Sequence, residues 1–312
     1  MSESNDFKNM KAPIGDLIRQ VEQQLASRGG PVPERSREGG CSRCGGRGFV
    51  LGREGSAAVA QLCGCDVRCA ACGGKGFLLE MRGGYQFHSR CECQTLAQRV
   101  AAYNAAQIPA RFSDKGFERY YVEGSSGEPV RELMKAKRDL MQFADTARPG
   151  HTTLGIGLLG GPGRGKTHLL AATLSRLTLG RGVQCRYIEI SFLFADLKAA
   201  ISDPRARATV DKIEELAAVD VLAIDELGKG RGSTFEEEVL DELIGRRYNN
   251  GRLTLFATNY PREEQEPTRD GKQELWHQSL RTRVGERVYS RLHEMVAFIE
   301  FSRATPDRRI PG

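Results

Sequence analysis

Short apolar runs alternate with helical patterns through the second half of the chain. Five of these runs have the length and apolar content of buried strands. Strands that are apolar on both faces are typical of a parallel sheet with helices on each side. We therefore expect an α/β fold in which helices flank a parallel five-stranded sheet. The predicted strands are residues 153–159, 183–190, 219–225, 253–258 and 296–301.

The chain before this region divides into an arm, a cysteine-rich segment and a linker. In the arm, apolar residues from Ile14 to Leu25 fit helical spacing and precede a Gly-Gly-Pro-Val-Pro breaker. This stretch is either a helix packed on its own protein or a docking helix for a partner. The linker is basic and rich in alanine, with helices expected at 95–106 and 128–146. The expected domains are 1–40 (helical arm), 41–93 (cysteine-rich domain), 94–150 (helical linker) and 151–312 (α/β domain).

The composition is that of a soluble globular protein. Charged residues make up 28% of the 312 residues and apolar residues 39%, and no apolar run approaches the ~20 residues that a membrane span needs. The first residues lack the apolar core of a secretory signal peptide, so we expect a cytoplasmic protein without a membrane partner. The formal net charge of +6 suits a nucleic-acid partner but does not require one.

A glycine-rich motif follows the first predicted strand of the α/β region. It reads Gly-Gly-Pro-Gly-Arg-Gly-Lys-Thr and fits the phosphate-binding pattern G-x-x-x-x-G-K-[ST] between a strand and a helix. Glycines let backbone N–H groups turn toward phosphates, and the helix N-terminus adds positive potential. We expect Lys166 to reach the β- and γ-phosphates of ATP and the Thr167 hydroxyl to bind Mg²⁺. The expected nucleotide contacts are Gly160, Gly161, Pro162, Gly163, Arg164, Gly165, Lys166, Thr167 and His168.

Two further strand ends supply polar groups for the same site. Asp225 and Glu226 end a buried strand, at the edge where parallel sheets place their ligands. We expect Asp225 to bind Mg²⁺ through water and Glu226 to orient and polarise the attacking water. Asn259 ends the next strand and is expected to hydrogen-bond the γ-phosphate or that water. The structural alternatives are an ordinary acidic strand-to-loop turn and an asparagine that favours turns.

Eight of the nine cysteines fall in an internal repeat. Each copy has a C-x-x-C-G-G-x-G-F segment and a trailing C-x-C, and the copies lie 28 residues apart (69 minus 41). Four thiolates suit a tetrahedral structural zinc, and the glycines permit the tight turn that aims both sulfurs at the metal. We expect two Zn²⁺ ions per chain, with disulfides or an iron–sulfur cluster as alternatives. The expected ligands are Cys41, Cys44, Cys63, Cys65, Cys69, Cys72, Cys91 and Cys93.

The spacing allows two ways of pairing these cysteines. Pairing within each repeat makes two self-contained sites, whereas nested pairing places the inner four, from Cys63 to Cys72, on one zinc and the outer four on the other. A duplication that keeps every cysteine in register favours self-contained units. His88 lies near Cys91 and is not expected to bind metal, and Cys185 is expected to be a buried apolar residue.

These motifs resemble the AAA+ ATPases and, among them, the helicase loaders of the DnaC/DnaI type with their IstB-like relatives. The resemblance covers about residues 104–310, and its most discriminating segment is Gly-Glu-Arg-Val-Tyr-Ser-Arg-Leu at 285–292. It implies an ATPase that loads a replicative hexameric helicase of the DnaB type onto single-stranded DNA and works as a homo-oligomer. The matching segments are 108–112, 160–167, 225–228, 247–251, 257–260 and 284–292.

The resemblance also implies roles for residues that the motifs alone leave open. Asn259 would be the sensor 1 residue. An arginine finger on the helix at 286–292 would reach the γ-phosphate in a neighbouring subunit, with Arg291 preferred and Arg287 second; the alternative is a solvated helix face. A sensor 2 arginine should follow the last strand, with Arg308 preferred among Arg303, Arg308 and Arg309.

Contacts with DNA are also expected from the resemblance. Proteins of this type carry an extra helix toward single-stranded DNA after the second strand, which corresponds here to residues 191–201. Phe192 and Lys198 on it would suit base stacking and phosphate contact, whereas Phe194 is expected in the core. Further candidates in the glycine-rich loop after Glu226 are Lys229 and Arg231.

Two other functions stay open at this point. A transposition helper ATPase would share the ATPase core, but such helpers usually lack thiolate modules. A zinc-dependent adaptor would use the nucleotide only as a switch. The C-x-x-C-G-G-x-G-F segments are similar to the zinc domain of DnaJ-type chaperones, where pairing is nested, and the second copy resembles the single N-terminal zinc module of DnaI-type and phage-encoded loaders. The duplication departs from that single module and leaves the N-terminal partner open.

Overall fold

The computed structural model describes most of the chain from Cys41 onward. The described residues are 41–65, 69, 71–73, 75–82, 85–124, 127–128, 130–148, 153–201, 207–263, 278–302, 305 and 307. The predicted arm helix and the three sensor 2 candidates, Arg303, Arg308 and Arg309, lie outside these residues and stay predictions. No described helix has the length and apolar character that crossing a bilayer requires.

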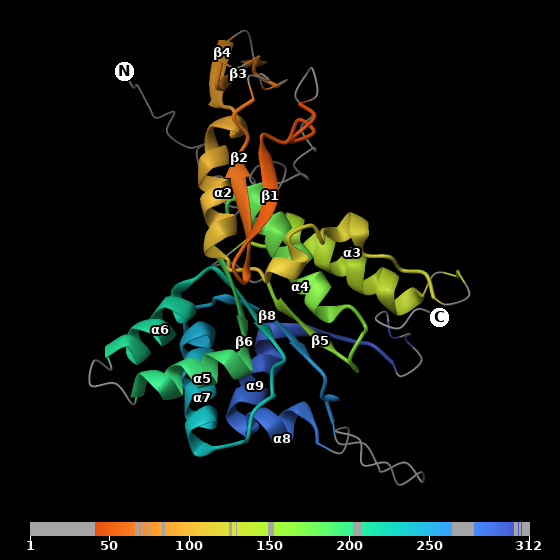
Figure 1. Cartoon of the computed structure of the whole chain (residues 1–312), viewed down its shortest axis with the longest axis vertical. Helices are drawn as coiled ribbons and strands as arrows, with labels where there is room; N and C mark the ends of the chain where they lie inside the picture. The colour runs from red at the N-terminus through yellow and green to blue at the C-terminus, as the bar shows by residue number, and fades with distance from the viewer. Residues whose placement is uncertain are drawn as a thin grey trace, which may run out of the picture.

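A sheet of five parallel strands forms the centre of the molecule, in the order β6-β7-β8-β5-β9 (Figure 1). Every residue of β5, β7 and β8 is buried, which is why continuous apolar runs mark them in the sequence. Each strand lies within a predicted run, so the expected parallel sheet is confirmed. The strands are β5 (Gly155–Leu159), β6 (Cys185–Glu189), β7 (Val221–Asp225), β8 (Leu253–Thr258) and β9 (Val296–Glu300).

Helices cover both faces of this sheet, and two apolar clusters form the core between the layers. Side chains alternate along β7, so that Val221 and Ala223 join one cluster while Leu222 and Ile224 join the other. The first face is covered by α2 (Leu96–Ala105), α3 (Arg131–Thr146) and α4 (Lys166–Ser175), which continues into the π-helical turn η4 (Arg176–Gly180). The second face is covered by α5 (Ile190–Ile201), α6 (Arg207–Ala218), α7 (Thr234–Asn249), α8 (Leu280–Val284) and α9 (Glu286–Met295).

Both linker helices lie within the predicted ranges, and the largest difference is at the start of α3. Helix α3 begins at Arg131 rather than at Glu128, because a residue that precedes proline disfavours the helical conformation. Val130 is still extended, with φ −87° and ψ 116°. Short single turns complete the linker: η1 (Glu92–Thr95), η2 (Ala110–Phe112) and η3 (Phe117–Arg119).

Each cysteine repeat folds into an antiparallel hairpin that the sequence analysis does not predict. The first hairpin pairs β1 (Phe49–Glu54) with β2 (Ala57–Leu62), and the second pairs β3 (Phe77–Arg82) with β4 (Tyr85–Arg90). The first lies along α2, whereas the second stands beyond the end of α2 that is far from the central sheet (Figure 1). The two copies therefore have different surroundings in spite of their common pattern.

Candidate nucleotide site and metal centres

The P-loop leaves β5 and turns into the N-terminus of α4. Gly160, Gly163 and Gly165 have φ angles of +143°, +79° and +81°, which glycine adopts without strain. Gly165 is the N-cap residue of α4, so the first N–H groups of the helix face the loop. The sequence motif therefore has the backbone of an anion-binding turn at a helix N-terminus.

Lys166 lies inside this loop and is only 7% exposed. Its ammonium donates hydrogen bonds to the carbonyl oxygens of Gly160 (2.6 Å) and Gly161 (2.8 Å) and to Oδ1 of Asn259 (2.7 Å). The predicted phosphate ligand and the predicted sensor thus meet, although 93 residues separate them in the sequence.

Asn259 also contacts the predicted water-activating carboxylate. Its Nδ2 donates to Oε2 of Glu226 at 3.0 Å, so one amide lies between the ammonium of Lys166 and the carboxylate of Glu226. Glu226 has a φ of +55°, and a non-glycine residue in the left-handed region costs on the order of 1–3 kcal/mol. Such strain is typical of residues that must aim a side chain at a site.

Asp225 and Thr167, the two predicted Mg²⁺ ligands, are in direct contact. The Thr167 hydroxyl donates to Oδ2 of Asp225 at 2.8 Å, and the backbone N–H of Glu226 donates to Oδ1 at 3.0 Å. A hydroxyl and a carboxylate at this edge of the sheet are the hard oxygen ligands that Mg²⁺ prefers. The residues present therefore fit a magnesium ion bound beside the P-loop.

Tyr187 on β6 is a further member of the site that the sequence analysis missed. Its hydroxyl donates to Oδ2 of Asp225 at 2.7 Å. Burial and the Asp225 carboxylate raise the pKa of Tyr187, so its hydroxyl stays protonated and donates to the carboxylate. No motif surrounds this tyrosine, and a single aromatic residue in a strand is ordinary core in a sequence.

Part of the linker packs against the P-loop. The hydroxyl of Tyr120 donates to the carbonyl of Arg164 at 3.1 Å, and a Cβ placed on Gly165 would lie 2.7 Å from the Tyr120 ring. Nε2 of His168 lies 3.0 Å from the carbonyl oxygen of Gly116. Residues 116–120 thus pack on the loop, and His168, a predicted nucleotide contact, is bonded to this segment.

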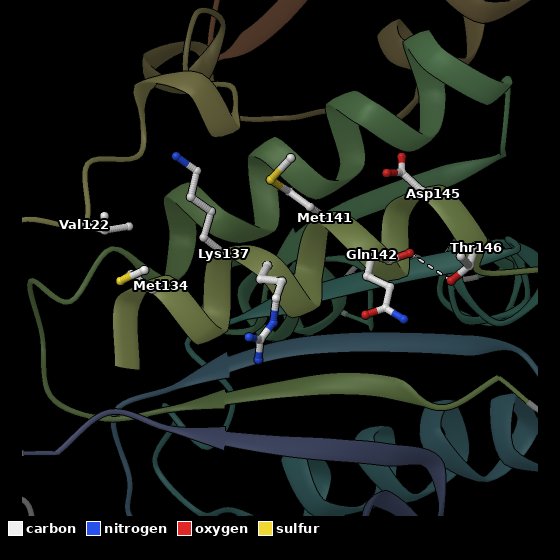
Figure 2. Close-up of a pocket in the computed structure, with 8 residues that line it drawn as sticks. Val122, Met134, Lys137, Met141, Gln142, Asp145 and Thr146 are labelled. Carbon is white, nitrogen blue, oxygen red and sulfur yellow. Dashed lines mark hydrogen bonds between the residues drawn. The ribbon is translucent and has the colours of Figure 1, made fainter. Parts of the chain in front are cut away.

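A hollow of about 560 Å³ lies along α3, and none of the residues that line it belongs to the P-loop (Figure 2). Lys137, Met141 and Asp145, spaced four residues apart, project from one side of the helix. Asp145 is held by Arg176 at 2.6 Å, and Lys137 donates to the carbonyl of Tyr120 at 3.0 Å. Because no P-loop residue lines this hollow, we assign it no role in phosphate binding.

The predicted arginine fingers both lie on α9. Nη1 of Arg291 pairs with Oδ1 of Asp241 on α7 at 2.6 Å, whereas Arg287, one turn earlier, is exposed. Arg291 would have to leave Asp241 to act on a neighbouring subunit. The structure thus gives Arg287 the readier access, and both arginines stay candidates.

The predicted DNA contacts occupy one region around α5 and the loop after β7. Lys198 pairs with Glu236 at 2.7 Å, and Lys229 pairs with Glu189 at 3.3 Å. Arg231 is exposed, as is Phe192, which keeps 66% of its surface in solvent. Phe194 is 5% exposed and joins the core, as predicted.

The eight repeat cysteines form two clusters, each drawn from one repeat, and in each cluster the four sulfurs lie within 4.8 Å of one another. The shortest contacts are 3.8 Å between Cys41 and Cys63 and 3.6 Å between Cys72 and Cys93, and all eight thiols are free of disulfides. The structure thus groups the cysteines within repeats, as the in-register duplication favours. Each cluster is a set of four thiols that could hold a zinc ion.

The backbone around the first cluster favours thiolate. Desolvation raises the pKa of the Cys44 thiol, but hydrogen bonds from the backbone of Gly48 and Gly46 outweigh it and lower the pKa to about 6. Gly46 and Gly48 have positive φ angles of 85° and 82°, which allow the turn that directs their N–H groups to the sulfur. In the same cluster, burial and the neighbouring thiols raise the pKa of Cys63 to about 12, so the four thiols do not share the lowered pKa of Cys44.

The remaining cysteine and the nearby histidine lie outside these clusters. Cys185 is 3% exposed within the core, where burial raises the pKa of its thiol, as expected for an apolar residue. His88 stacks on Phe77 with ring centroids 5.4 Å apart and is not part of the sulfur cluster.

Comparison with known proteins finds similarity to ATP-binding proteins. Residues 125–273 match the family described as IstB-like ATP binding protein. The replicative helicase loader DnaC of Escherichia coli (strain K12) is 32% identical over 165 residues, which are 52% of this chain and 62% of that protein. The phage-like element PBSX protein XkdC of Bacillus subtilis (strain 168) is 27% identical over 214 residues, which are 65% of this chain and 70% of that protein.

A crystal structure of the DnaC helicase loader has the same fold, with a TM-score of 0.50 and 24% identity over 62% of this chain and 99% of that chain. This chain spans less than two thirds of the length of the DnaC proteins that it matches. The predicted AAA+ fold is confirmed by the sheet and by this similarity. Residues 125–273 are therefore similar to IstB-like ATP-binding proteins, the domain has the AAA+ fold, and about half of the chain is similar to a DnaC-type helicase loader.

Proposed function

We propose that this chain hydrolyses ATP and uses the reaction to load a replicative hexameric helicase onto single-stranded DNA. One observation carries the hydrolysis: Lys166 after β5, Glu226 after β7 and Asn259 after β8 form one hydrogen-bonded chain. A phosphate ligand, a carboxylate able to orient water and an amide between them are what phosphoryl transfer to water needs from a protein.

Each residue then has a distinct role. Lys166 would bind the β- and γ-phosphates, while Thr167 and Asp225 would hold Mg²⁺, which when bound stabilises charge on the transferred phosphoryl group. Glu226 would orient the attacking water and accept its proton. Because Asn259 lies between them, it keeps the Lys166 ammonium and the Glu226 carboxylate from closing into a direct ion pair.

An arginine from a neighbouring subunit would complete the site. Arg291 and Arg287 lie on α9, and one of them would be this arginine finger. An arginine supplied in trans adds charge stabilisation in the transition state and makes hydrolysis depend on assembly. We therefore infer a homo-oligomer. Arg308 stays the proposed sensor 2 residue.

The proposal of helicase loading rests on the proteins to which this chain is similar. A protein named replicative helicase loader is 32% identical to this chain over 165 residues. The two cysteine clusters also favour a loader, because transposition helpers usually lack such modules. The zinc and N-terminal segments would contact a DnaB-type helicase. Lys198 and Lys229, once released from Glu236 and Glu189, would contact the phosphates of single-stranded DNA, and so would the exposed Arg231.

The test has two parts. Phosphate release is measured with and without single-stranded DNA for the wild type, for Glu226→Gln and for the exposed control Glu237→Gln. Hydrolysis should be lost in Glu226→Gln alone. The wild type is then mixed with the replicative helicase of its host and analysed by size-exclusion chromatography. Absence of a complex would refute the proposed helicase loading.

A zinc-dependent adaptor that uses the nucleotide only as a switch makes the opposite prediction. In that case, Glu226→Gln would keep the cellular function and Cys69→Ser would abolish it. A transposase gene beside this one would instead favour the transposition helper.

A further inference from the structure

The first cysteine module is covered by its own chain. Ala58 and Ala60 on β2 are 0% and 1% exposed, because α2 packs on the face of the hairpin that they share with Leu51. The side chain of Asn104 on α2 bonds both backbone groups of Ala60, accepting from its N–H at 2.7 Å and donating to its carbonyl at 3.1 Å. One face of this hairpin is thus covered, and the backbone at its outer edge is hydrogen-bonded.

The chain after α2 completes this cover. The N–H of Ala58 donates to the carbonyl of Ile108 at 2.7 Å, and the N–H of Ala110 donates to the carbonyl of Ser56 at 2.8 Å. The segment that covers the first hairpin is therefore a helix followed by a short extended stretch.

The second module has no such cover among the described residues. The repeat places Phe77, Leu79 and Met81 where the first copy has Phe49, Leu51 and Arg53, and they are 39%, 49% and 69% exposed. Tyr85 and Phe87 on β4 are 74% and 51% exposed. Of the eleven large apolar residues exposed in the part of the chain that the structure describes, five lie on this one hairpin. Phe77, Leu79 and Met81 share one face of the hairpin, whereas Phe87 and Tyr85, which pair with Glu80 and Arg82, lie on the other face. Three exposed apolar side chains in a row on one face are typical of an interaction surface.

The charges of this module argue against nucleic acid as the occupant. Lys75, Arg82 and Arg90 are offset by Glu80, Glu92 and the net charge of about −2 that a zinc ion with four thiolates carries. Binding to a phosphate backbone rests on excess positive charge, which this module lacks. An apolar surface without net positive charge suits a protein.

We propose that the second hairpin docks a helix of the replicative helicase, in the way that α2 covers the first hairpin. The inference rests on the proposed loader function and adds which module and which face bind. Phe77, Leu79 and Met81 are alternate residues of one strand and span about 13 Å, which matches two to three turns of a helix with an apolar stripe.

The contact differs from that in the first module in one respect. Gln86 and His88 replace Ala58 and Ala60, so the bulkier side chains keep a helix from approaching β4 as closely as α2 approaches β2. The docked helix therefore lies over Phe77, Leu79 and Met81 on β3.

The test uses the full zinc-loaded chain and the purified replicative helicase of its host. Isothermal titration calorimetry gives the dissociation constant for the wild type, for Leu79→Asp, for Met81→Asp and for Leu62→Asp. The last changes a leucine that is 53% exposed on β2 and serves as the control. We expect at least tenfold weaker binding for both changes in the second module and unchanged binding for the control. Zinc content and ATPase activity should be unchanged in all three variants.

The outcomes separate the two proposals. If the wild type binds no helicase, the proposed function fails and this inference fails with it. If the wild type binds and both variants of the second hairpin bind equally well, only the docking face is wrong. If these variants instead change the oligomeric mass without helicase, or weaken binding to a labelled single-stranded oligonucleotide alone, the occupant is a second copy of the chain or a nucleic acid, and the inference is overturned.

Discussion

Replacing Asn259 by alanine tests the central contact of the proposed site. The amide is bonded to two charged groups, at 2.7 Å to the Lys166 ammonium and at 3.0 Å to the Glu226 carboxylate. Removing it has unequal consequences for the two. Lys166 keeps the carbonyls of Gly160 and Gly161 as acceptors, whereas Glu226 loses the amide that fixes it and has Lys229 at 3.9 Å to draw it aside.

The expected effect is therefore on turnover more than on binding. Hydrogen bonds to charged groups contribute about 1.5–3 kcal/mol each, and only the bond to Glu226 is lost without replacement. We expect kcat to fall about 10- to 100-fold, which corresponds to ~1.4–2.8 kcal/mol in the activation barrier. The KM for ATP should stay within about threefold, and a stability loss of ~1 kcal/mol would lower Tm by about 2–4 °C in a chain of this size.

The assay is steady-state phosphate release over a range of ATP concentrations at fixed protein concentration. Asn259→Asp is the matched variant, because it keeps an acceptor for Lys166 but places a negative charge against Glu226. It should lower kcat at least as much as alanine does. A KM raised tenfold with kcat retained would show that Asn259 binds ground-state phosphate, and wild-type turnover in Asn259→Asp would refute the link to Glu226.

Other predictions follow from single contacts. Arg287→Ala and Arg291→Ala should each keep ATP binding, measured with a fluorescent analogue, and the variant that lacks the finger should lose hydrolysis; full turnover in both would remove α9 from the site. Elemental analysis should give two zinc ions per chain, and iron or a single zinc would overturn the cysteine assignment. Cys91→Ser should lose one zinc with normal ATPase activity, whereas Cys63→Ser should lose the other and weaken ATP binding. Burial raises the pKa of Glu236, but bonds from Lys198 and from the N–H groups of Arg231 and Gly232 lower it overall, so the carboxylate stabilises the fold above its unfolded pKa. Glu236→Gln should therefore lower Tm at pH 7, and the difference from wild type should shrink as pH falls through the lowered pKa of Glu236.

The sheet and the P-loop could be predicted because their constraints are local. Burial on both faces makes each strand a continuous apolar run, and the phosphate loop needs glycines at fixed spacing. The hairpins were missed because their strands mix small, polar and apolar residues, as in Phe-Val-Leu-Gly-Arg-Glu of β1. Tyr187 and Tyr120 were missed because their roles depend on partners 38 and 44 residues away, Asp225 and Arg164.

The grouping of the cysteines follows from the hairpins. In each copy, a glycine carbonyl before the first strand accepts from the N–H of the third cysteine, Gly48 from Cys63 at 2.8 Å and Gly76 from Cys91 at 2.9 Å. Each hairpin therefore returns the C-x-C pair to the C-x-x-C pair of its own repeat. Spacing alone could not separate this arrangement from the nested one, because both satisfy a four-thiolate zinc.

The linker between the modules and the sheet explains why duplication is useful here. The first hairpin bonds Ile108 and Ser113, through Ala58 (2.7 Å) and Arg53 (3.3 Å). The same linker then contacts the P-loop, where Tyr120 bonds Arg164 at 3.1 Å. A module packed against the linker in this way has its apolar face covered and cannot also bind a partner with it. A second copy has the same hairpin with four cysteines and leaves that face exposed, as the proposed docking of a partner requires.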